Sequence, residues 1–172
     1  MHKKQIEFCL RVKERFQHYF SDSLVLDVGS MDINGNNRSL FNGGEYIGLD
    51  IGAGKNVDVV CPVHLYKPER QFDVVISTNM LEHDKYWGKS LPAMVHLLRS
   101  KGLLLISAAS TKRREHGTTE KSSGSSPFTN DFYKNVTRND LNSGLKFRQN
   151  FSKYECSLSR NIKDVYFWGI KR

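Results

Sequence analysis

The sequence predicts an α/β fold: a Rossmann-like, doubly wound sheet of about seven strands, mostly parallel, with an antiparallel strand in a C-terminal hairpin. Short apolar segments rich in leucine and β-branched residues recur between residues 24 and 107, and most are continuous rather than alternating. Strands buried on both faces of a parallel sheet have this pattern. Two longer apolar segments then follow one another near the C-terminal end, which predicts the hairpin.

Size and composition favour one globular domain over residues 1–172. A chain of 172 residues accommodates one sizeable core and is short for two ordinary domains. No run approaches the roughly 18 consecutive apolar residues of a membrane span, so we expect no membrane partner. Three widely spaced cysteines, Cys9, Cys61 and Cys156, form no disulfide or zinc-binding pattern and suit the reducing cytoplasm, where we expect the protein to be located.

Residues 1–107 predict two helices and five strands. We expect the first helix within residues 1–22, where apolar residues recur at spacings of three and four. That stripe includes Ile6, Cys9, Leu10, Phe16 and Phe20. Ser90 is the expected N-cap of the second helix, with Pro92 in its first turn and Gly102 closing it. The strands expected around these helices are residues 24–28, 46–49, 57–60, 72–77 and 103–107.

Residues 108–136 interrupt the alternation of strands and helices as a long, polar, basic loop, which we expect to lie on the substrate side. After it, Thr137 and Asp140 resemble a capping box that opens a short helix, and Gly144 would end this helix. The two terminal strands are expected at residues 145–154 and 165–171, joined around residues 159–161.

The formal net charge is +8, and it is unevenly distributed. Residues 21–110 hold 8 basic and 10 acidic side chains, whereas residues 1–20 hold 5 and 2, and residues 111–172 hold 13 and 6. Basic flanks around a near-neutral middle favour an anionic partner.

Acidic residues end two successive predicted strands and indicate a cofactor that contains a nucleoside. Asp27 and Gly29 end the first strand, and Asp50 ends the second. The glycine allows a close approach of ligand to backbone, and the second carboxylate can accept hydrogen bonds from both ribose hydroxyls. The first turn lacks the Gly-x-Gly-x-x-Gly cradle of a diphosphate and places a negative charge where cationic groups of S-adenosylmethionine could be held. We therefore expect S-adenosylmethionine rather than a nicotinamide cofactor.

Ordered motifs over residues 20–172 resemble the type-11-like branch of class I S-adenosylmethionine-dependent methyltransferases. The motifs are Val25-Leu26-Asp27-Val28-Gly29-Ser30, Asn34-Gly35-Asn36-Asn37-Arg38, Tyr46-Ile47-Gly48-Leu49-Asp50, Val57-Asp58-Val59-Val60, Phe72-Asp73-Val74-Val75-Ile76-Ser77, Met80-Leu81-Glu82-His83, Leu98-Arg99-Ser100-Lys101-Gly102-Leu103-Leu104 and Asp164-Val165-Tyr166-Phe167-Trp168-Gly169-Ile170.

This resemblance implies a seven-stranded sheet with an antiparallel last strand, and it also implies the cofactor contacts. These are Asp27, Gly29 and Ser30 at the methionine end, Asp50 at the ribose and Ile51 at the adenine. Many relatives place an aspartate after the third strand to meet the adenine amino group, whereas this chain has Pro62 in that stretch. Either His64 or a backbone group would replace that contact.

Three residues are the candidate catalytic or acceptor-side groups: His83, His116 and Tyr133. His83 follows the strand at 72–77 and could act as a general base, since a histidine pKa lies near neutrality. The alternative is that Glu82 and His83 position their loop and contact the cofactor. His116 and Tyr133 lie in the 108–136 loop, over the expected acceptor entrance. Because His83, Asp84 and His116 have no recognised metal-ligand spacing, we expect no metal.

The sequence therefore predicts an S-adenosylmethionine-dependent methyltransferase that modifies an oxygen or nitrogen of a polar, anionic small molecule. The basic flanks also allow an alternative, an RNA or DNA methyltransferase or a nucleic-acid-binding module. Ser77-Thr78-Asn79-Met80 stands where base-amino methyltransferases have Asn/Asp-Pro-Pro-Phe/Tyr, and this counts against the alternative. No sequence pattern indicates an oligomeric state.

Overall fold

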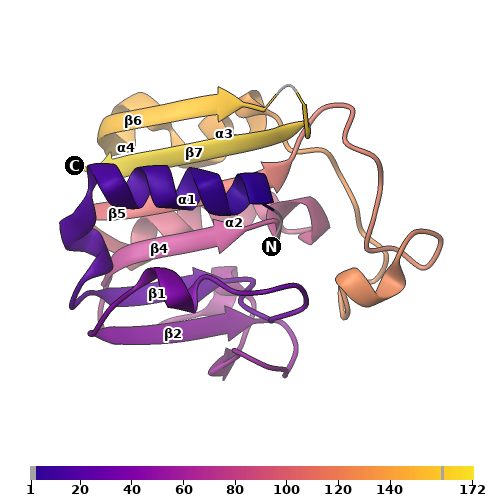
Figure 1. Cartoon of the computed structure of the whole chain (residues 1–172), viewed down its shortest axis with the longest axis horizontal. Coiled ribbons are helices and arrows are strands. Elements are labelled where there is room, and N and C mark those ends of the chain that lie inside the picture. The colour runs from indigo at the N-terminus through magenta and orange to yellow at the C-terminus, as the bar shows by residue number, and fades with distance from the viewer. Residues whose placement is uncertain (1–2, 160) are drawn as a thin grey trace.

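The computed structural model describes residues 3–159 and 161–172, and its centre is one seven-stranded sheet in the order β3-β2-β1-β4-β5-β7-β6 (Figure 1). Strands β1 to β5 pair in parallel, whereas β7 lies antiparallel between β5 and β6. The predicted Rossmann-like sheet with an antiparallel C-terminal strand is therefore confirmed. The strands are β1 (Leu24–Val28), β2 (Glu45–Asp50), β3 (Val59–Val60), β4 (Phe72–Thr78), β5 (Leu98–Ala109), β6 (Phe151–Leu158) and β7 (Asp164–Lys171).

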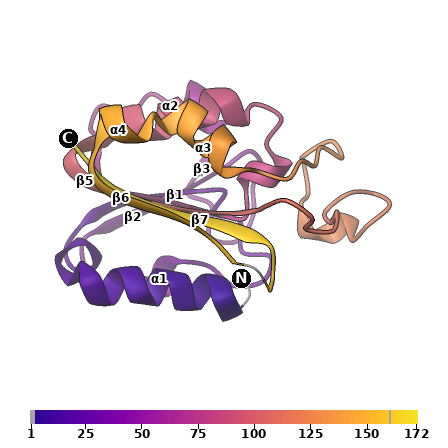
Figure 2. The same ribbon diagram turned by 90° about the horizontal axis from the view of Figure 1, so that it is seen from above.

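Helices cover both faces of the sheet, as a doubly wound fold requires (Figure 2). Helix α1 (Lys3–Arg15) lies on one face, and α2 (Trp87–Leu97), α3 (Arg138–Leu145) and α4 (Phe147–Asn150) lie on the other. Alternate side chains of the central strands enter the two cores: Leu103 and Leu105 pack on the α1 side, and Leu104 and Ile106 on the α2 side. Short 3-10 turns complete the connections: η1 (Gln17–Phe20), η2 (Arg38–Leu40), η3 (Val63–Leu65), η4 (Leu81–His83) and η5 (Ser123–Ser125).

The N-terminal helix is shorter than the predicted segment 1–22, of which residues 1–2 lie outside the described part. Helix α1 ends at Arg15, and the separate turn η1 follows. Phe16 leaves the helical conformation and packs against Trp168 of β7, with the ring centroids 4.9 Å apart. The chain turns here because the aromatic residues that follow α1 pack against the sheet. Leu10, expected in the buried stripe, is 43% exposed.

Helix α2 begins and ends earlier than predicted. Its N-cap is Tyr86, and Ser90 is buried inside the helix rather than capping it. Pro92 therefore lies beyond the first turn. Gly102 does not close the helix but lies within β5, where a Cβ atom would meet the carbonyl oxygen of Asp73 at 2.9 Å. This glycine serves close packing of the strands rather than helix termination.

The capping box that opens α3 is confirmed: the amide of Asp140 donates to Thr137 Oγ1 at 3.1 Å, and the amide of Thr137 donates to Asp140 Oδ2 at 2.8 Å. Gly144, however, does not end this helix. Lys146 ends it with a left-handed φ of 49°, and a Cβ atom at Gly144 would lie 2.6 Å from the side chain of Leu91. The glycine lets α3 pack closely on α2.

The strand predicted at residues 145–154 is helical in its first part, because α4 precedes β6. β6 begins only at Phe151 and pairs with β7 as the expected hairpin. Of the predicted connection at residues 159–161, Arg160 lies outside the described residues.

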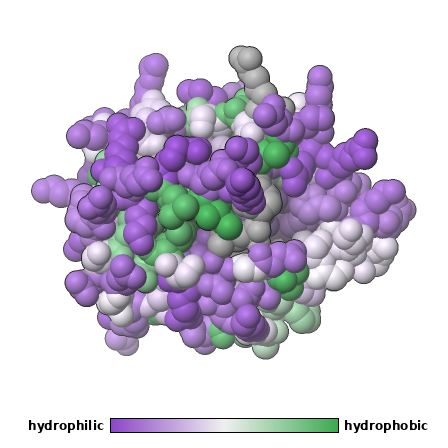
Figure 3. Space-filling view, in the orientation of Figure 1, coloured by the Kyte–Doolittle hydropathy of each residue, from purple (hydrophilic) through white to green (hydrophobic). Residues whose placement is uncertain are grey.

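Residues 108–136 start in β5 and then form a long loop that projects from one end of the sheet (Figure 1). The face that carries α1 is mainly hydrophilic apart from a limited apolar area, and the loop forms a lobe at its right-hand edge (Figure 3). The amide of Thr119 donates to Asp131 at 2.8 Å, which closes this lobe on itself. Among the described residues, no helix combines the length and apolar character that a membrane crossing requires.

Candidate active site

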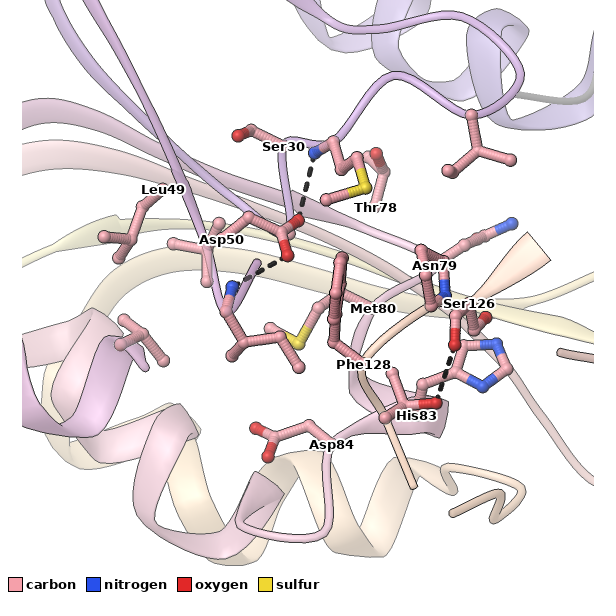
Figure 4. A pocket seen from close by; sticks show the side chains of 18 of the residues that line it. Ser30, Leu49, Asp50, Thr78, Asn79, Met80, His83, Asp84, Ser126 and Phe128 are labelled. Carbon is pink, nitrogen blue, oxygen red and sulfur yellow. Dashed lines mark hydrogen bonds between the residues drawn. The ribbon is translucent and has the colours of Figure 1, made fainter. Parts of the chain in front are cut away.

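A cavity of about 760 Å³ lies at the carboxyl ends of β1, β2 and β4, beneath the 108–136 loop (Figure 4). In an open α/β sheet this edge is where ligands bind, next to the point at which the strand order reverses. The volume is that of a small-molecule or cofactor site. The residues that line it include Gln5, Asp27, Gly29, Ser30, Asn37, Asp50, Ile51, His64, Met80, His83, Arg113, His116, Ser126 and Phe128.

Asp50 ends β2 with its carboxylate at the cavity (Figure 4). Oδ1 accepts from the amide of Ile51 at 2.7 Å and from that of Gly52 at 3.4 Å, and Oδ2 accepts from the amide of Met31 at 3.0 Å. The carboxylate thereby links the turn after β1 to the end of β2. Since a carboxylate offers about four lone-pair sites, Oδ2 retains capacity for a hydroxyl donor from a ligand.

Gly29 begins the turn after β1 in a conformation that favours glycine, with a φ of +79°. A Cβ atom there would lie 2.4 Å from Cγ of Met80, the residue before η4. The glycine therefore allows the segments after β1 and β4 to approach each other at the cavity. The adjacent Ser30 is buried, and its Oγ has no hydrogen-bond partner among the described residues.

Asp27 is buried at the base of the cavity and is 1% exposed. Asn37 Nδ2 donates to its carboxylate at 3.1 Å, and the hydroxyl of Tyr46 donates to it as well. Burial nevertheless raises the pKa of the Asp27 carboxyl to about 6, because two neutral donors compensate only part of the lost hydration. A cationic group in the cavity would stabilise the ionised form.

The cavity wall beyond Asp50 contains the residues expected at the adenine. Ile51 lines it and is 45% exposed, so its side chain is available to pack against a ligand. His64 lies in η3, its ring is 4.8 Å from that of Tyr86, and its buried Nδ1 has no hydrogen-bond partner among the described residues. The structure thus places both residues at this wall.

Phe128 is a cavity residue that the sequence did not indicate. It lies in the long loop, and its ring covers Gly52, where a Cβ atom would meet Cδ2 of the ring at 2.1 Å. In the close-up it lies between the Asp50 end and the His83 end of the cavity (Figure 4). The side chain is 59% exposed, and its φ is +69°. No local pattern could indicate this contact, because it depends on the path of a long loop.

The opposite end of the cavity brings together the three residues predicted on the acceptor side. The ring of His83 lies 5.0 Å from that of His116 and 5.5 Å from that of Tyr133, and the last two rings are 5.1 Å apart. Both histidines line the cavity, whereas Tyr133 packs behind them and donates to the carbonyl of Arg114 at 3.2 Å. Burial lowers the pKa of His83 to about 4, so its ring is neutral at neutral pH.

Glu82, the neighbour of His83 in the sequence, is a buried carboxylate beside this cluster. It is 0% exposed, and neither of its side-chain oxygens has a hydrogen-bond partner of ordinary geometry among the described residues. Burial raises its pKa to about 7. A buried carboxylate without a partner is unfavourable and calls for a proton or a cation.

The basic side chains of the long loop differ in their relation to the cavity. Arg113 lines it, donates to the carbonyl of Ile162 at 2.6 Å and lies 3.6 Å from Asp164. Lys134 instead pairs with Asp140 at 3.1 Å and lies over the ring of Trp87, so it faces α2 and α3. Of these two basic side chains, only Arg113 is placed to meet a ligand in the cavity.

Solved structures with this fold include several methyltransferases. A 1,6-didemethyltoxoflavin-N1-methyltransferase from Burkholderia thailandensis, with S-adenosylhomocysteine bound, is 17% identical at a TM-score of 0.67 and covers 98% of this chain and 78% of its own. An S-adenosylmethionine-dependent methyltransferase from Clostridium acetobutylicum is 12% identical at a TM-score of 0.64, and the match covers 99% of this chain and 92% of that protein. The phosphoethanolamine N-methyltransferase 2 of Haemonchus contortus, also with S-adenosylhomocysteine, is 17% identical at a TM-score of 0.64. This match covers 95% of this chain and 52% of that protein.

No family model matches the chain, and no curated protein matches it in sequence. The structural likeness establishes the fold: this chain has the Rossmann-like fold of class I S-adenosylmethionine-dependent methyltransferases. A fold of this kind supports many activities, so the function has to be argued from the cavity.

Proposed function

We propose that the protein is an S-adenosylmethionine-dependent methyltransferase that modifies an oxygen or nitrogen of a polar, anionic small molecule. One observation carries the proposal. The carboxylates of Asp27 and Asp50 line one cavity at the carboxyl ends of two adjacent parallel strands, next to the close turn at Gly29. Two carboxylates there suit a nucleoside with a cationic tail and disfavour a diphosphate.

The unpaired polar atoms around the cavity fit this cofactor. Asp50 would accept a ribose hydroxyl, and Asp27 would balance the positive charge of the methionine end, with Gly29 and Ser30 beside it. Ile51 and His64 would contact the adenine, since the Nδ1 atom of His64 can accept from its amino group. The buried Oγ of Ser30, which has no partner among the described residues, is the kind of atom that a bound ligand satisfies.

S-adenosylmethionine, when bound, supplies a methyl group on a sulfonium, which an aligned nucleophile displaces. The residues of this chain would hold the acceptor in line with that group, and this alignment is a major part of the rate enhancement in such a transfer. His83 and His116 face the cavity at the end opposite the adenine wall, with Tyr133 packed against both rings. The neutral His83 offers an unshared electron pair to the acceptor side.

The acceptor's charge is inferred from the cations at the cavity. Arg113 and Lys85 both line it. An arginine can bind a carboxylate or phosphate through two parallel hydrogen bonds, which gives orientation as well as attraction. An anionic acceptor group would therefore lie toward Arg113, with its reactive oxygen or nitrogen toward the histidines.

Transfer of labelled methyl from S-adenosylmethionine into a fractionated cell extract tests this proposal. We expect label in the small, anionic metabolite fraction, and we expect the wild-type protein to transfer much more label than the Asp50→Asn variant. Label recovered in RNA or DNA would show that the acceptor assignment is wrong while the cofactor assignment stands. An absence of transfer to any fraction would count against the activity itself.

A further inference from the structure

The most unusual chemical feature outside the cofactor region is the cluster of Glu82, His83 and His116. One potential ligand atom from each residue lies within 4.8 Å of the others. Two of the residues belong to η4, after β4, and the third comes from the long loop, more than thirty residues further along the chain. Two imidazoles and one carboxylate are a recurrent ligand set for catalytic zinc and for iron(II).

The polar atoms of the cluster are unsatisfied in the way that metal ligands are. Both oxygens of Glu82 and the Nδ1 atom of His83 are buried without a hydrogen-bond partner among the described residues. Burying a carboxylate without a counter-charge is strongly unfavourable, and buried charges in proteins are paired or coordinate metals. The charge of Arg113 lowers the pKa of Glu82 only in part, because Arg113 lies 3.6 Å from Asp164 and donates to a backbone carbonyl rather than pairing with Glu82.

A backbone carbonyl orients the ring of His116 as such contacts orient metal-bound histidines. Nδ1 of His116 lies 3.1 Å from the carbonyl oxygen of Arg114, which leaves Nε2 available. The buried Nδ1 atom of His83 has no hydrogen-bond partner among the described residues and is available to a ligand. A metal-bound histidine usually donates its other ring N–H to a backbone carbonyl or a carboxylate, which fixes the tautomer and aims the free nitrogen.

Local packing holds the loop histidine against η4. Gly117, with a φ of +73°, follows His116, and a Cβ atom there would lie 2.6 Å from Cε1 of His83. Only a glycine permits this approach. Ligand atoms around a tetrahedral ion with bonds of about 2.1 Å are about 3.4 Å apart, so closing from 4.8 Å requires movements of about 1 Å or less per side chain.

We propose that Glu82, His83 and His116 bind one divalent transition-metal ion of the zinc or iron(II) class. This inference rests on the proposed function in one respect, because an ion here would use its open coordination position to hold an anionic oxygen of the acceptor. Bound to the cation, a hydroxyl acceptor would lose its proton more readily. From the sequence we expected no metal site. The proposed site becomes apparent only because the long loop brings His116 to Glu82 and His83.

Titration of Zn²⁺ into the full chain, after removal of metals with a chelator, tests the site by calorimetry. We expect one ion per chain, with at least about tenfold weaker binding in His116→Ala and in Glu82→Gln. His116 is in the loop and partly exposed, so its replacement should leave folding intact even if the change at Glu82 does not. His96→Ala is the control, since this exposed histidine on α2 lies outside the cavity lining.

Wild-type protein that binds no Zn²⁺, or binds it equally well after His116→Ala, would overturn the assignment. Loss of binding in His96→Ala would show a surface site instead. S-adenosylhomocysteine is titrated in parallel into the metal-free protein and into His116→Ala. If the protein binds S-adenosylhomocysteine but not Zn²⁺, only the proposal of a metal site is refuted. If it binds Zn²⁺ but not S-adenosylhomocysteine, only the cofactor assignment is refuted.

Discussion

Replacement of Asp50 by asparagine removes the negative charge from the proposed ribose contact while keeping the shape of the side chain. Three backbone amides already donate to this carboxylate, two to Oδ1 and one to Oδ2. A ribose hydroxyl would therefore use the remaining capacity of Oδ2. In Asp50→Asn the Nδ2 group must face either a backbone N–H, to which it cannot hydrogen-bond, or the ligand hydroxyl, which then loses its charged acceptor.

A hydrogen bond to a charged group contributes about 1.5–3 kcal/mol, so we expect the Kd for S-adenosylhomocysteine to rise about 10-fold to 150-fold. Isothermal titration calorimetry measures this change directly. Asp58→Asn is the matched control, because Asp58 also accepts a backbone hydrogen bond, from Gly48 at 2.7 Å, but does not line the cavity. A Kd that stays within twofold in Asp50→Asn, or an equal loss in Asp58→Asn, would refute the ribose assignment.

Three further predictions concern other residues of the cavity. Gly29→Ala should lower the free energy of unfolding, measured by urea denaturation, by about 2–4 kcal/mol, because the new Cβ atom clashes with Met80 and the residue keeps a left-handed φ. Gly88→Ala is the control, and it should be neutral or stabilising because Gly88 lies in open space on α2. The folded pKa of Asp27, about 6, lies above its ordinary value of 3.8, so its contribution to stability is complete below pH 3.8 and is lost as the pH rises through 6. Between pH 5 and pH 7.5, wild type should therefore lose about 1 kcal/mol relative to Asp27→Asn, and parallel pH profiles would contradict this. Phe128→Ala should weaken S-adenosylhomocysteine binding about 3-fold to 10-fold through lost aromatic contact without altering the unfolding midpoint, and an unchanged Kd would exclude Phe128 from the nucleoside site.

The central parallel strands could be located from the sequence because burial on both faces of a sheet dictates composition locally. β1 has the predicted bounds, and β4 differs from its prediction by one residue. The helix ends were harder, since Gly102 and Gly144 are where strands or helices pack closely and not where helices stop. Glycine has the same appearance in the sequence in both roles, and only the tertiary contacts distinguish them.

The cofactor side of the cavity was more predictable than the acceptor side for a related reason. Asp27, Gly29 and Asp50 are placed by the strands that they end, so their convergence follows from parallel pairing. Phe128 reaches the cavity, and Glu82 reaches the histidine cluster beside it, only through the folding of a loop more than twenty residues long and of η4. No periodicity encodes that path, and for this reason the Glu82–His83–His116 cluster became visible only in three dimensions.

The central claim is that the cavity binds S-adenosylmethionine and not a dinucleotide, and thermal unfolding with added ligand tests it most directly. S-adenosylmethionine or S-adenosylhomocysteine at 100 times its Kd should stabilise the folded chain by about 2.7 kcal/mol and raise Tm by several degrees, whereas NAD at the same concentration should leave Tm unchanged. Stabilisation by NAD, or by none of the three ligands, would contradict the account.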